Sequence, residues 1–295
     1  MNGIVFASDR AGWIWAGRNT ILASTDSGAT WSVLRTNLSG PDTDIARLSF
    51  IDDSRGWAAG SLGHRPSIWK SEDGGRSWSL RCEWPRAFAD SLGAILDIQF
   101  VDQSRGWAVG FNGLSAMIVA TTDGGEHWKL QYSGSEITSQ FRQVRFSDSR
   151  HGWALSYEAV MQTQDGGESW KLRYFDKGTL NSIDATSESD VWLAGAWGYL
   201  LHTRNGVRWS EVRFSGSLGA SYLGHVKFTG QGLGWAWGAK CDIAMTRDFG
   251  KTWAQEPCPL DPPLRSEITT GQMVATSSRL LMIANPGRVL VRSIE

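Results

Sequence analysis

An eight-residue pattern, Ser/Thr-x-Asp-x-Gly-x-x-Trp, recurs along this chain and constrains its fold more than any other feature. Full copies end at Trp31, Trp78, Trp128, Trp170 and Trp253, and a copy that is one residue shorter ends at Trp209. Successive copies are 39 residues (Trp170 to Trp209) to 50 residues (Trp78 to Trp128) apart. A repeat of this length is typical of a four-stranded propeller blade. The pattern therefore predicts a series of small sheets.

A second pattern keeps step with the first and reads apolar-x-Phe, a polar turn, then Gly-Trp-Ala-x-Gly. Ile98–Phe100 followed by Gly106–Gly110 is a typical copy. Other copies begin at Ile4, Leu48, Val144 and Val226, a weaker one begins at Ile183, and one without its Trp begins at Met273. Alternating apolar residues between clusters of Gly, Asp and Ser indicate strands and turns.

These seven units predict an all-β fold, a single β-propeller domain over residues 1–295. Seven blades are expected, with the seventh incomplete because its repeat ends without the eight-residue pattern, and six blades is the alternative. A single sheet of this kind cannot bury both of its faces, so the blades are expected to stack in a ring. The expected blades cover approximately residues 1–40, 41–90, 91–138, 139–178, 179–218, 219–262 and 263–295.

The eight-residue pattern has a mechanical explanation. Asp and Asn side chains accept hydrogen bonds from nearby backbone N–H groups, and Gly takes the positive φ that the turn needs. The Trp that follows folds under the turn, and burial of its ring removes about 150–250 Å² from water. We therefore predict a structural role for Asp26, Trp31, Asp73, Trp78, Asp123, Trp128, Asp165, Trp170, Asn205, Trp209, Asp248 and Trp253.

Composition and charge exclude several other classes of protein. The formal net charge of −1 gives no overall attraction to nucleic acid or to an anionic membrane. No apolar stretch is as long as a membrane span, and the first residues do not resemble a signal peptide. We expect a soluble protein, cytoplasmic by default or exported if a leader was removed, so its location stays open.

The residue types that usually form catalytic or metal sites stand in no recognisable motif here. We therefore predict no catalytic residue, no metal and no cofactor. The chain lacks His-Glu-x-x-His, Gly-x-Ser-x-Gly and a phosphate loop. Its three Cys have no CxxC spacing, and its five His lie in different units without metal-ligand spacing. Cys241 and Cys258 are expected on one face of the sixth blade, where they would pair only in an exported protein.

The eight-residue pattern resembles the Asp-box, or BNR, repeat. Its combination with Gly-Trp-Ala-x-Gly, as in Gly106–Gly110 with Thr121–Trp128, is most similar to the photosystem II assembly and stability factor family over nearly the whole chain. This resemblance implies a non-catalytic, seven-bladed propeller that holds a protein partner during assembly, through an arginine-rich surface. The chain departs from the family in its last repeat, which has no Asp-box, and in lacking a lipoprotein leader.

The strands of a blade alternate in direction, so one face of the ring carries the connections between blades and the turns between second and third strands. We call it the loop face. Arg and aromatic residues recur there, a composition typical of interface hot spots. We predict that this face binds a protein, as an acidic or extended polypeptide segment, and that the chain is monomeric by itself. The candidate partner-binding residues are Arg35, Arg47, Arg81, Trp84, Arg86, Tyr132, Arg142, Tyr157, Arg173, Tyr174, Trp197, Tyr199, Arg213 and Tyr222. In the competing interpretation, each Arg pairs with a neighbouring carboxylate.

Two other functions stay open at this point. The same loop face would serve an inhibitor of the immunity type, which neutralises a partner by covering its active site. Asp-boxes also occur in sialidases and xyloglucan-degrading enzymes, so a glycan-binding or glycoside-hydrolysing propeller is the second alternative. Hydrolysis needs two facing carboxylates, and the loop-face candidates stand in no recognisable motif: Glu83, Asp90, Glu136, Glu158, Asp176 and Asp242.

Overall fold

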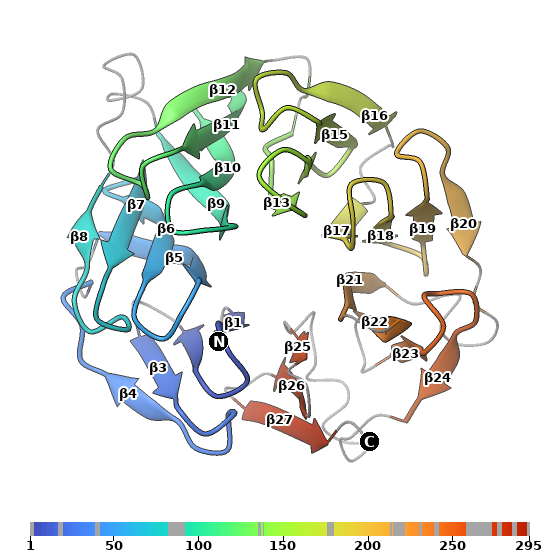
Figure 1. The fold of residues 1–295 in the computed structure, drawn as a ribbon, viewed down its shortest axis with the longest axis horizontal. Coiled ribbons are helices and arrows are strands. Elements are labelled where there is room, and N and C mark those ends of the chain that lie inside the picture. Colours follow the sequence, from blue (N-terminus) through green and yellow to red (C-terminus); the bar gives the residue numbers. More distant parts are fainter. Residues whose placement is uncertain are drawn as a thin grey trace.

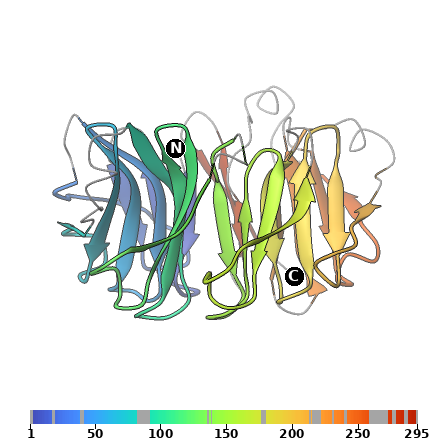
Figure 2. The ribbon, with the colours of Figure 1, turned by 90° about the horizontal axis from the view of Figure 1, so that it is seen from above.

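The computed structural model describes residues 3–16, 20–38, 42–81, 92–134, 137, 139–175, 180–212, 214, 222–229, 232–238, 242–257, 273–275, 279–284 and 288–293. These residues form strands and turns and contain no α-helix, hence no helix that could cross a membrane. The strands form small sheets arranged as a ring around a central axis (Figure 1), and in side view they run roughly along that axis (Figure 2). The predicted all-β propeller is confirmed.

Six of the sheets have four antiparallel strands in chain order. In the first three blades the strands are β1 (Gly3–Phe6), β2 (Gly12–Ala16), β3 (Thr20–Ser24), β4 (Ser32–Leu34), β5 (Thr43–Phe50), β6 (Gly56–Leu62), β7 (Arg65–Ser71), β8 (Ser79–Leu80), β9 (Gly93–Phe100), β10 (Gly106–Asn112), β11 (Ser115–Thr121) and β12 (Lys129–Gly134). In the next three they are β13 (Gln143–Phe146), β14 (Gly152–Leu155), β15 (Ala159–Thr163), β16 (Lys171–Phe175), β17 (Leu180–Ala185), β18 (Val191–Gly195), β19 (Leu200–Thr203), β20 (Ser210–Val212), β21 (Leu223–Phe228), β22 (Gly234–Gly238), β23 (Ile243–Thr246) and β24 (Ala254–Glu256).

The remaining sheet has three strands, β25 (Met273–Ala275), β26 (Arg279–Ala284) and β27 (Arg288–Ser293). It stands between the sixth and the first blade (Figure 1), where the sequence predicted an incomplete seventh blade. The alternative prediction of six blades corresponds to the six complete, four-stranded sheets. Ile4 and Ile14 of the first blade form a buried apolar cluster with Leu281 of β26. Among the described strands, the first and last sheets thus meet through side-chain packing, and neither contains a strand from the other.

The second Asp-box shows how each turn between third and fourth strands is held. The backbone N–H of Gly75 donates to the Ser71 hydroxyl at 2.8 Å. The Asp73 carboxylate accepts from the backbone N–H of Ser77 at 2.9 Å and from its hydroxyl. Gly75 has a φ of +86°, which favours glycine, and its carbonyl accepts from Trp78 Nε1 at 2.9 Å. The same Asp-centred bonds recur in the first, third, fourth and sixth blades.

The most buried Trp residues are those of the second strands, and they join neighbouring blades. In three of them the indole Nε1 donates at 3.0 Å to a carbonyl in the Asp-box of the next blade, in the pairs Trp13–Gly74, Trp57–Gly124 and Trp107–Gly166. The Phe of the next blade's first strand stacks on each ring at centroid distances of 3.5 to 3.7 Å. The sequence emphasised the Trp of the Asp-box, whereas these second-strand rings hold the blades together.

The contact between the fourth and fifth blades departs from this scheme. The fifth Asp-box is one residue short, and its blade has Ala185 where the other four-stranded blades have Phe. Trp153 is fully buried and packs edge-on against Trp209 at 6.1 Å. Its Nε1 has no hydrogen-bond partner among the described residues. The deletion in the repeat thus coincides with a lost bond between blades.

Acid is expected to destabilise the protein through its Asp-box carboxylates. Hydrogen bonds from the hydroxyl and backbone N–H of the residue four positions on lower the pKa values of Asp26, Asp165 and Asp248 to about 2. A pKa below its unfolded value, near 3.8, means that the stabilisation is complete above that value and is lost as pH falls toward 2. Urea unfolding should show the free energy of unfolding falling between about pH 5 and pH 2. In Asp165→Asn the slope should be shallower; an unchanged slope would contradict this account.

Candidate functional site

Several predicted partner-binding residues come together on one part of the loop face. Arg142 immediately precedes β13, Tyr157 lies between β14 and β15, and Trp197 lies between β18 and β19. In antiparallel sheets, the start of the first strand and the turn between the second and third lie at the same end. We call this group the aromatic sector, and define it as Arg142, Tyr157, Tyr174, Trp197, Tyr199 and Tyr222.

Arg142 and Tyr157 form the edge of the sector on the fourth blade. The guanidinium carbon of Arg142 lies 3.9 Å from the centroid of the Tyr157 ring, a close cation–π contact. Tyr157 is 42% exposed. The Nη1 atom of Arg142 is buried and has no hydrogen-bond partner within the described part of the chain. The stacked pair thus presents an aromatic surface beside a positive charge.

Trp197 is the most exposed aromatic side chain of the sector, at 80%. Its φ is +61°, and that of the following Gly198 is +68°. Two successive positive φ values are typical of a type I′ turn, where Asn-Gly is the preferred sequence. A bulky residue in this region is unusual, and such strain clusters at functional sites. The turn therefore holds a large apolar ring in solvent at a conformational cost.

Hydrogen bonds connect the sector across three blades. The hydroxyl groups of Tyr174, in the fourth blade, and Tyr199, in the fifth, lie 2.9 Å apart. The Tyr222 hydroxyl, at the start of the sixth blade, donates to Asn181 Oδ1 of the fifth at 2.7 Å. Asn181 Nδ2 donates in turn to the carbonyl of Leu223 at 3.0 Å. These bonds hold Tyr174, Tyr199 and Tyr222 in place before any partner arrives.

The other predicted binding residues have different surroundings. Arg81 forms an ion pair with Glu126, in the Asp-box of the next blade, at 3.1 Å. Arg173 Nε donates to Gln162 at 2.8 Å, so both guanidinium groups have partners on the ring itself. Tyr132 packs edge-on against Phe141 at 5.6 Å.

Arg35 is exposed just after β4, and Arg47 lies in the central channel described below. Trp84, Arg86 and Arg213 lie outside the described residues, as do Cys241 and Cys258.

The structure describes two of the six residues considered for hydrolysis, Glu158 and Asp242. Glu158 accepts a hydrogen bond from the backbone N–H of Ser139 at 3.1 Å, and Asp242 accepts through its carbonyl from Gly238. The other carboxylates considered for hydrolysis, Glu83, Asp90, Glu136 and Asp176, lie outside the described part of the chain. No group of three or more His, Cys, Asp or Glu side chains among the described residues could hold a metal ion.

The inner strands β1, β5, β9, β13, β17, β21 and β25 surround a central channel (Figure 1), which contains a cavity of about 350 Å³. The middle residue of each apolar-x-Phe unit contributes to its wall: Val5, Ser49, Gln99, Arg145, Asp184, Lys227 and Val274. The residues two positions earlier add Arg47, Gln143, Ser182 and His225. Apart from Arg47, which was a predicted partner-binding residue, sequence reasoning missed these residues, although the middle position is polar in five of the seven units and marks them.

Polar side chains of the channel wall also join one inner strand to the next. Gln99 Nε2 donates to the carbonyl of Phe146 at 3.0 Å, and its Oε1 accepts from the backbone N–H of Phe146 at 2.7 Å. Gln143 Oε1 accepts from the backbone N–H of Ile183 at 2.9 Å. An inner strand has no neighbour on its channel side, so these side chains satisfy backbone groups that would otherwise be unpaired.

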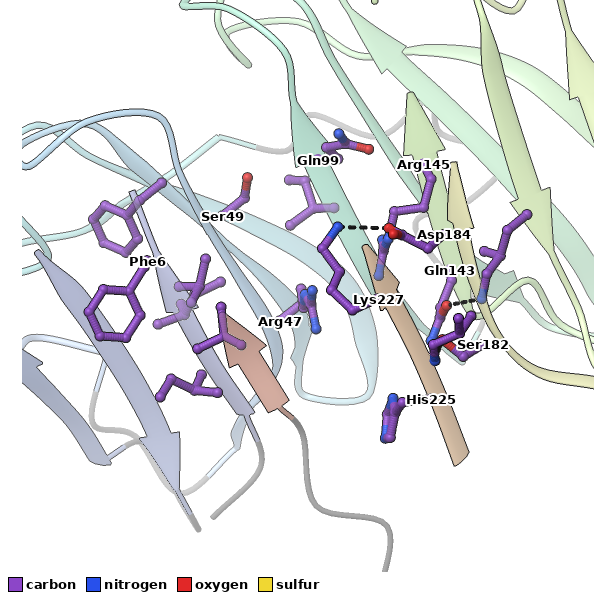
Figure 3. A pocket seen from close by; sticks show the side chains of 18 of the residues that line it. Phe6, Arg47, Ser49, Gln99, Gln143, Arg145, Ser182, Asp184, His225 and Lys227 are labelled. Carbon is purple, nitrogen blue, oxygen red and sulfur yellow. Dashed lines mark hydrogen bonds and ion pairs between the residues drawn. The ribbon is translucent and has the colours of Figure 1, made fainter. Parts of the chain in front are cut away.

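Charged side chains form two clusters in this wall. Asp97 pairs with Arg47 at 3.1 Å and with Arg145 at 2.5 Å. Asp184 pairs with Lys227 at 2.7 Å, and Figure 3 shows this pair beside Arg145, with Phe6 on the opposite side of the cavity. Burial lowers the pKa of Arg47, and the Asp97 carboxylate opposes this shift. One cluster therefore carries two cations against a single carboxylate.

The ring of sheets and the Asp-box turns place this chain among the Asp-box, or BNR-repeat, β-propellers. Within that class it resembles the photosystem II assembly factor YCF48. Residues 130–223 match the family described as "Photosynthesis system II assembly factor YCF48". No curated protein matches the chain significantly in sequence.

Solved structures share the fold. One described as "YCF48 bound to D1 peptide" has a TM-score of 0.74 and 19% identity, with 99% of this chain and 92% of that chain covered. YCF48 from Cyanidioschyzon merolae has a TM-score of 0.72 and 18% identity, with coverage of 98% and 94%. A GH74 xyloglucanase from Xanthomonas campestris, with a TM-score of 0.68 and 13% identity, is covered over 51% of its length by 98% of this chain.

Proposed function

We propose that this protein is a non-catalytic scaffold that captures a polypeptide segment on the aromatic sector, in the manner of an assembly factor. The observation that carries the proposal is Trp197, an exposed ring held in solvent by a turn with unfavourable backbone geometry. Conformational strain of this kind persists where function requires it. Trp is also the residue most enriched among interface hot spots.

The layout of the sector favours an extended partner. Tyr157, Trp197 and Tyr222 are exposed on three consecutive blades, and hydrogen bonds hold their neighbours in place. A partner segment that crosses these blades would meet one aromatic side chain after another. Because hydrogen bonds already hold Tyr174, Tyr199 and Tyr222, these side chains lose little entropy on binding.

The charge of the sector favours an acidic partner. Arg142 is partly exposed, and its guanidinium group stacks on the Tyr157 ring at the edge of the sector. Its positive charge favours a carboxylate that approaches beside this ring. A YCF48 of the same fold has been solved with a D1 peptide, which supports a peptide ligand here.

A crosslinking experiment can find the partner through the sector itself. A photoreactive amino acid placed at position 197 in the native host should capture a polypeptide. The matched control carries the same group at Leu114, which is 99% exposed on the corresponding turn of the third blade. A partner captured at position 197 and not at position 114 supports the proposal, and equal capture at both positions counts against it.

The second measurement is affinity for that partner by calorimetry. Trp197→Ala should weaken binding by about 2 kcal/mol, roughly 30-fold, because a hot-spot ring is removed. Arg142→Glu should weaken binding further at low salt than at high salt, since it opposes an acidic segment. Leu114→Ala should bind as the unmodified protein does. If Trp197→Ala also binds normally, the aromatic sector is not the binding surface.

A further inference from the structure

We propose that the central channel contains a binding site for a small oxyanion, of the phosphate, sulfate or carboxylate class, between Arg47 and Arg145. Both side chains reach the same carboxylate, Asp97, from neighbouring blades. Their guanidinium groups are therefore close together at the cavity. This site is independent of the aromatic sector, so the proposal does not rest on the proposed function.

The charges of the channel wall do not balance. Three cations, Arg47, Arg145 and Lys227, face two carboxylates, Asp97 and Asp184, which leaves one positive charge (3 − 2 = +1) among these described residues. Lys227 and Asp184 compensate each other, so the surplus lies with the two Arg residues. An unbalanced charge that is partly removed from water is unfavourable unless an anion or solvent compensates it.

One oxygen of each carboxylate is bonded to the backbone of a neighbouring strand, while Asp97 Oδ1 has only its ion pair with Arg47 among the described residues. Asp97 Oδ2 accepts from the backbone N–H of Val144 at 3.0 Å in addition to Arg145. Asp184 Oδ2 accepts from the backbone N–H of Phe228 at 2.7 Å in addition to its pairing with Lys227. Both carboxylates are thus directed to the strands.

The guanidinium groups, in contrast, retain free donors. Each Arg carries five N–H donors. Arg47 uses Nε toward Asp97, and Arg145 uses Nη1 toward Asp97 and the carbonyl of Val144. Within the described residues, their remaining nitrogens have no acceptor. The planar guanidinium group matches the geometry of carboxylate and phosphate oxygens.

The opposite side of the channel offers no competing charge in the described residues. Its wall there is formed by Val5 of β1 and Val274 of β25. The cavity of about 350 Å³ has room for a small oxyanion beside the two Arg side chains. A small oxyanion bound from solution would neutralise the surplus positive charge and accept hydrogen bonds from the free N–H donors.

The test is calorimetric titration of the full chain with inorganic phosphate in a chloride buffer of constant ionic strength. We expect saturable binding at a single site. At phosphate tenfold above its Kd, the thermal midpoint should rise by about 2–4 °C. Arg145→Gln should weaken phosphate binding at least tenfold. The matched control is Arg105→Gln, an exposed Arg paired with Asp102 outside the channel, and it should bind phosphate normally.

A second variant tests the site if loss of Arg145 impairs folding. Ser49→Asp adds a carboxylate to the channel wall and supplies the missing negative charge internally. It should fold, and its thermal midpoint should no longer respond to phosphate. A response like that of the unmodified protein, equal binding by Arg145→Gln and Arg105→Gln, or no saturable binding at all would overturn the proposal.

Two sources of the oxyanion can be separated by competition. A short peptide with a free terminal carboxylate is titrated against phosphate, and the same peptide with an amidated terminus is the control. Displacement of phosphate by the free carboxylate alone would indicate that a polypeptide end enters the channel. Binding of phosphate without displacement by either peptide would indicate a free inorganic anion. Both results support an oxyanion site.

Discussion

Replacement of Gly60 by Ala is expected to lower the free energy of unfolding by about 3 kcal/mol, because the new methyl group meets the backbone of the neighbouring strand. A Cβ atom at Gly60 would lie 1.8 Å from the carbonyl oxygen of Asp44. The close approach arises from a register shift between Ile45 and Arg47 in β5, opposite this residue. The backbone carbonyl cannot rotate away as a flexible side chain could.

The same conflict recurs in other blades, so its effects should add. A Cβ at Gly110 would lie 2.0 Å from the carbonyl oxygen of Ala94. Substitutions at distant sites usually add, so Gly60→Ala with Gly110→Ala should cost about 6 kcal/mol. That is comparable with the whole stability of many proteins, which is about 5–15 kcal/mol. We expect the double variant to be largely unfolded in circular dichroism at temperatures where each single variant is folded.

Gly63 provides the matched control. Its φ is +58°, and no atom lies within 4 Å of a Cβ built on it. Ala at this position should cost about 1 kcal/mol, from backbone conformation alone. Urea unfolding of Gly60→Ala and Gly63→Ala separates the steric from the conformational cost. If the two variants were equally stable, the close approach in β5 would not explain the glycine.

The second large effect concerns the Trp residues that join the blades. Trp57→Phe should lower the free energy of unfolding by about 3 kcal/mol, because it reduces buried volume and removes the hydrogen bond from Nε1 to the carbonyl of Gly124. Trp153→Phe removes a similar volume. It also removes an Nε1 that has no partner among the described residues. Its cost should be smaller than that of Trp57→Phe by about 1–2 kcal/mol.

Chemical denaturation of both variants measures this difference directly. Trp57 and Trp153 are both fully buried and occupy the same place in their repeats, so each is the other's control. A larger loss in Trp153→Phe than in Trp57→Phe would show that the contact between the fourth and fifth blades is not the weaker one.

The turns were predictable because their causes are local. The bonds that hold an Asp-box join residues at most four positions apart, as between Asp73 and Ser77. All the side-chain types that an Asp-box needs therefore occur within one eight-residue window and can be recognised there. The number of units and their strand order follow from the repeat spacing for the same reason. Local sequence patterns are thus sufficient to predict all of these features.

The candidate site was predictable only in part. Arg142, Tyr157 and Trp197 share the loop face, as their positions in the repeat indicate. The repeat could not reveal that Arg81 turns toward Glu126 of the next blade, since the two residues are 45 positions apart in the sequence (126 − 81). It also gave no sign that Tyr174 and Tyr199 meet through their hydroxyl groups.

By itself, the sequence determined the kind of building block and how many times it occurs, since alternation, turn residues and Trp placement act within one sheet. The contacts between residues of neighbouring blades were determined only by the closed ring. It brought Arg47 and Arg145 to one carboxylate and joined aromatic side chains from three blades. The physical reason is that these contacts are made between residues roughly one blade apart, where only the packing of one sheet against the next fixes their distance.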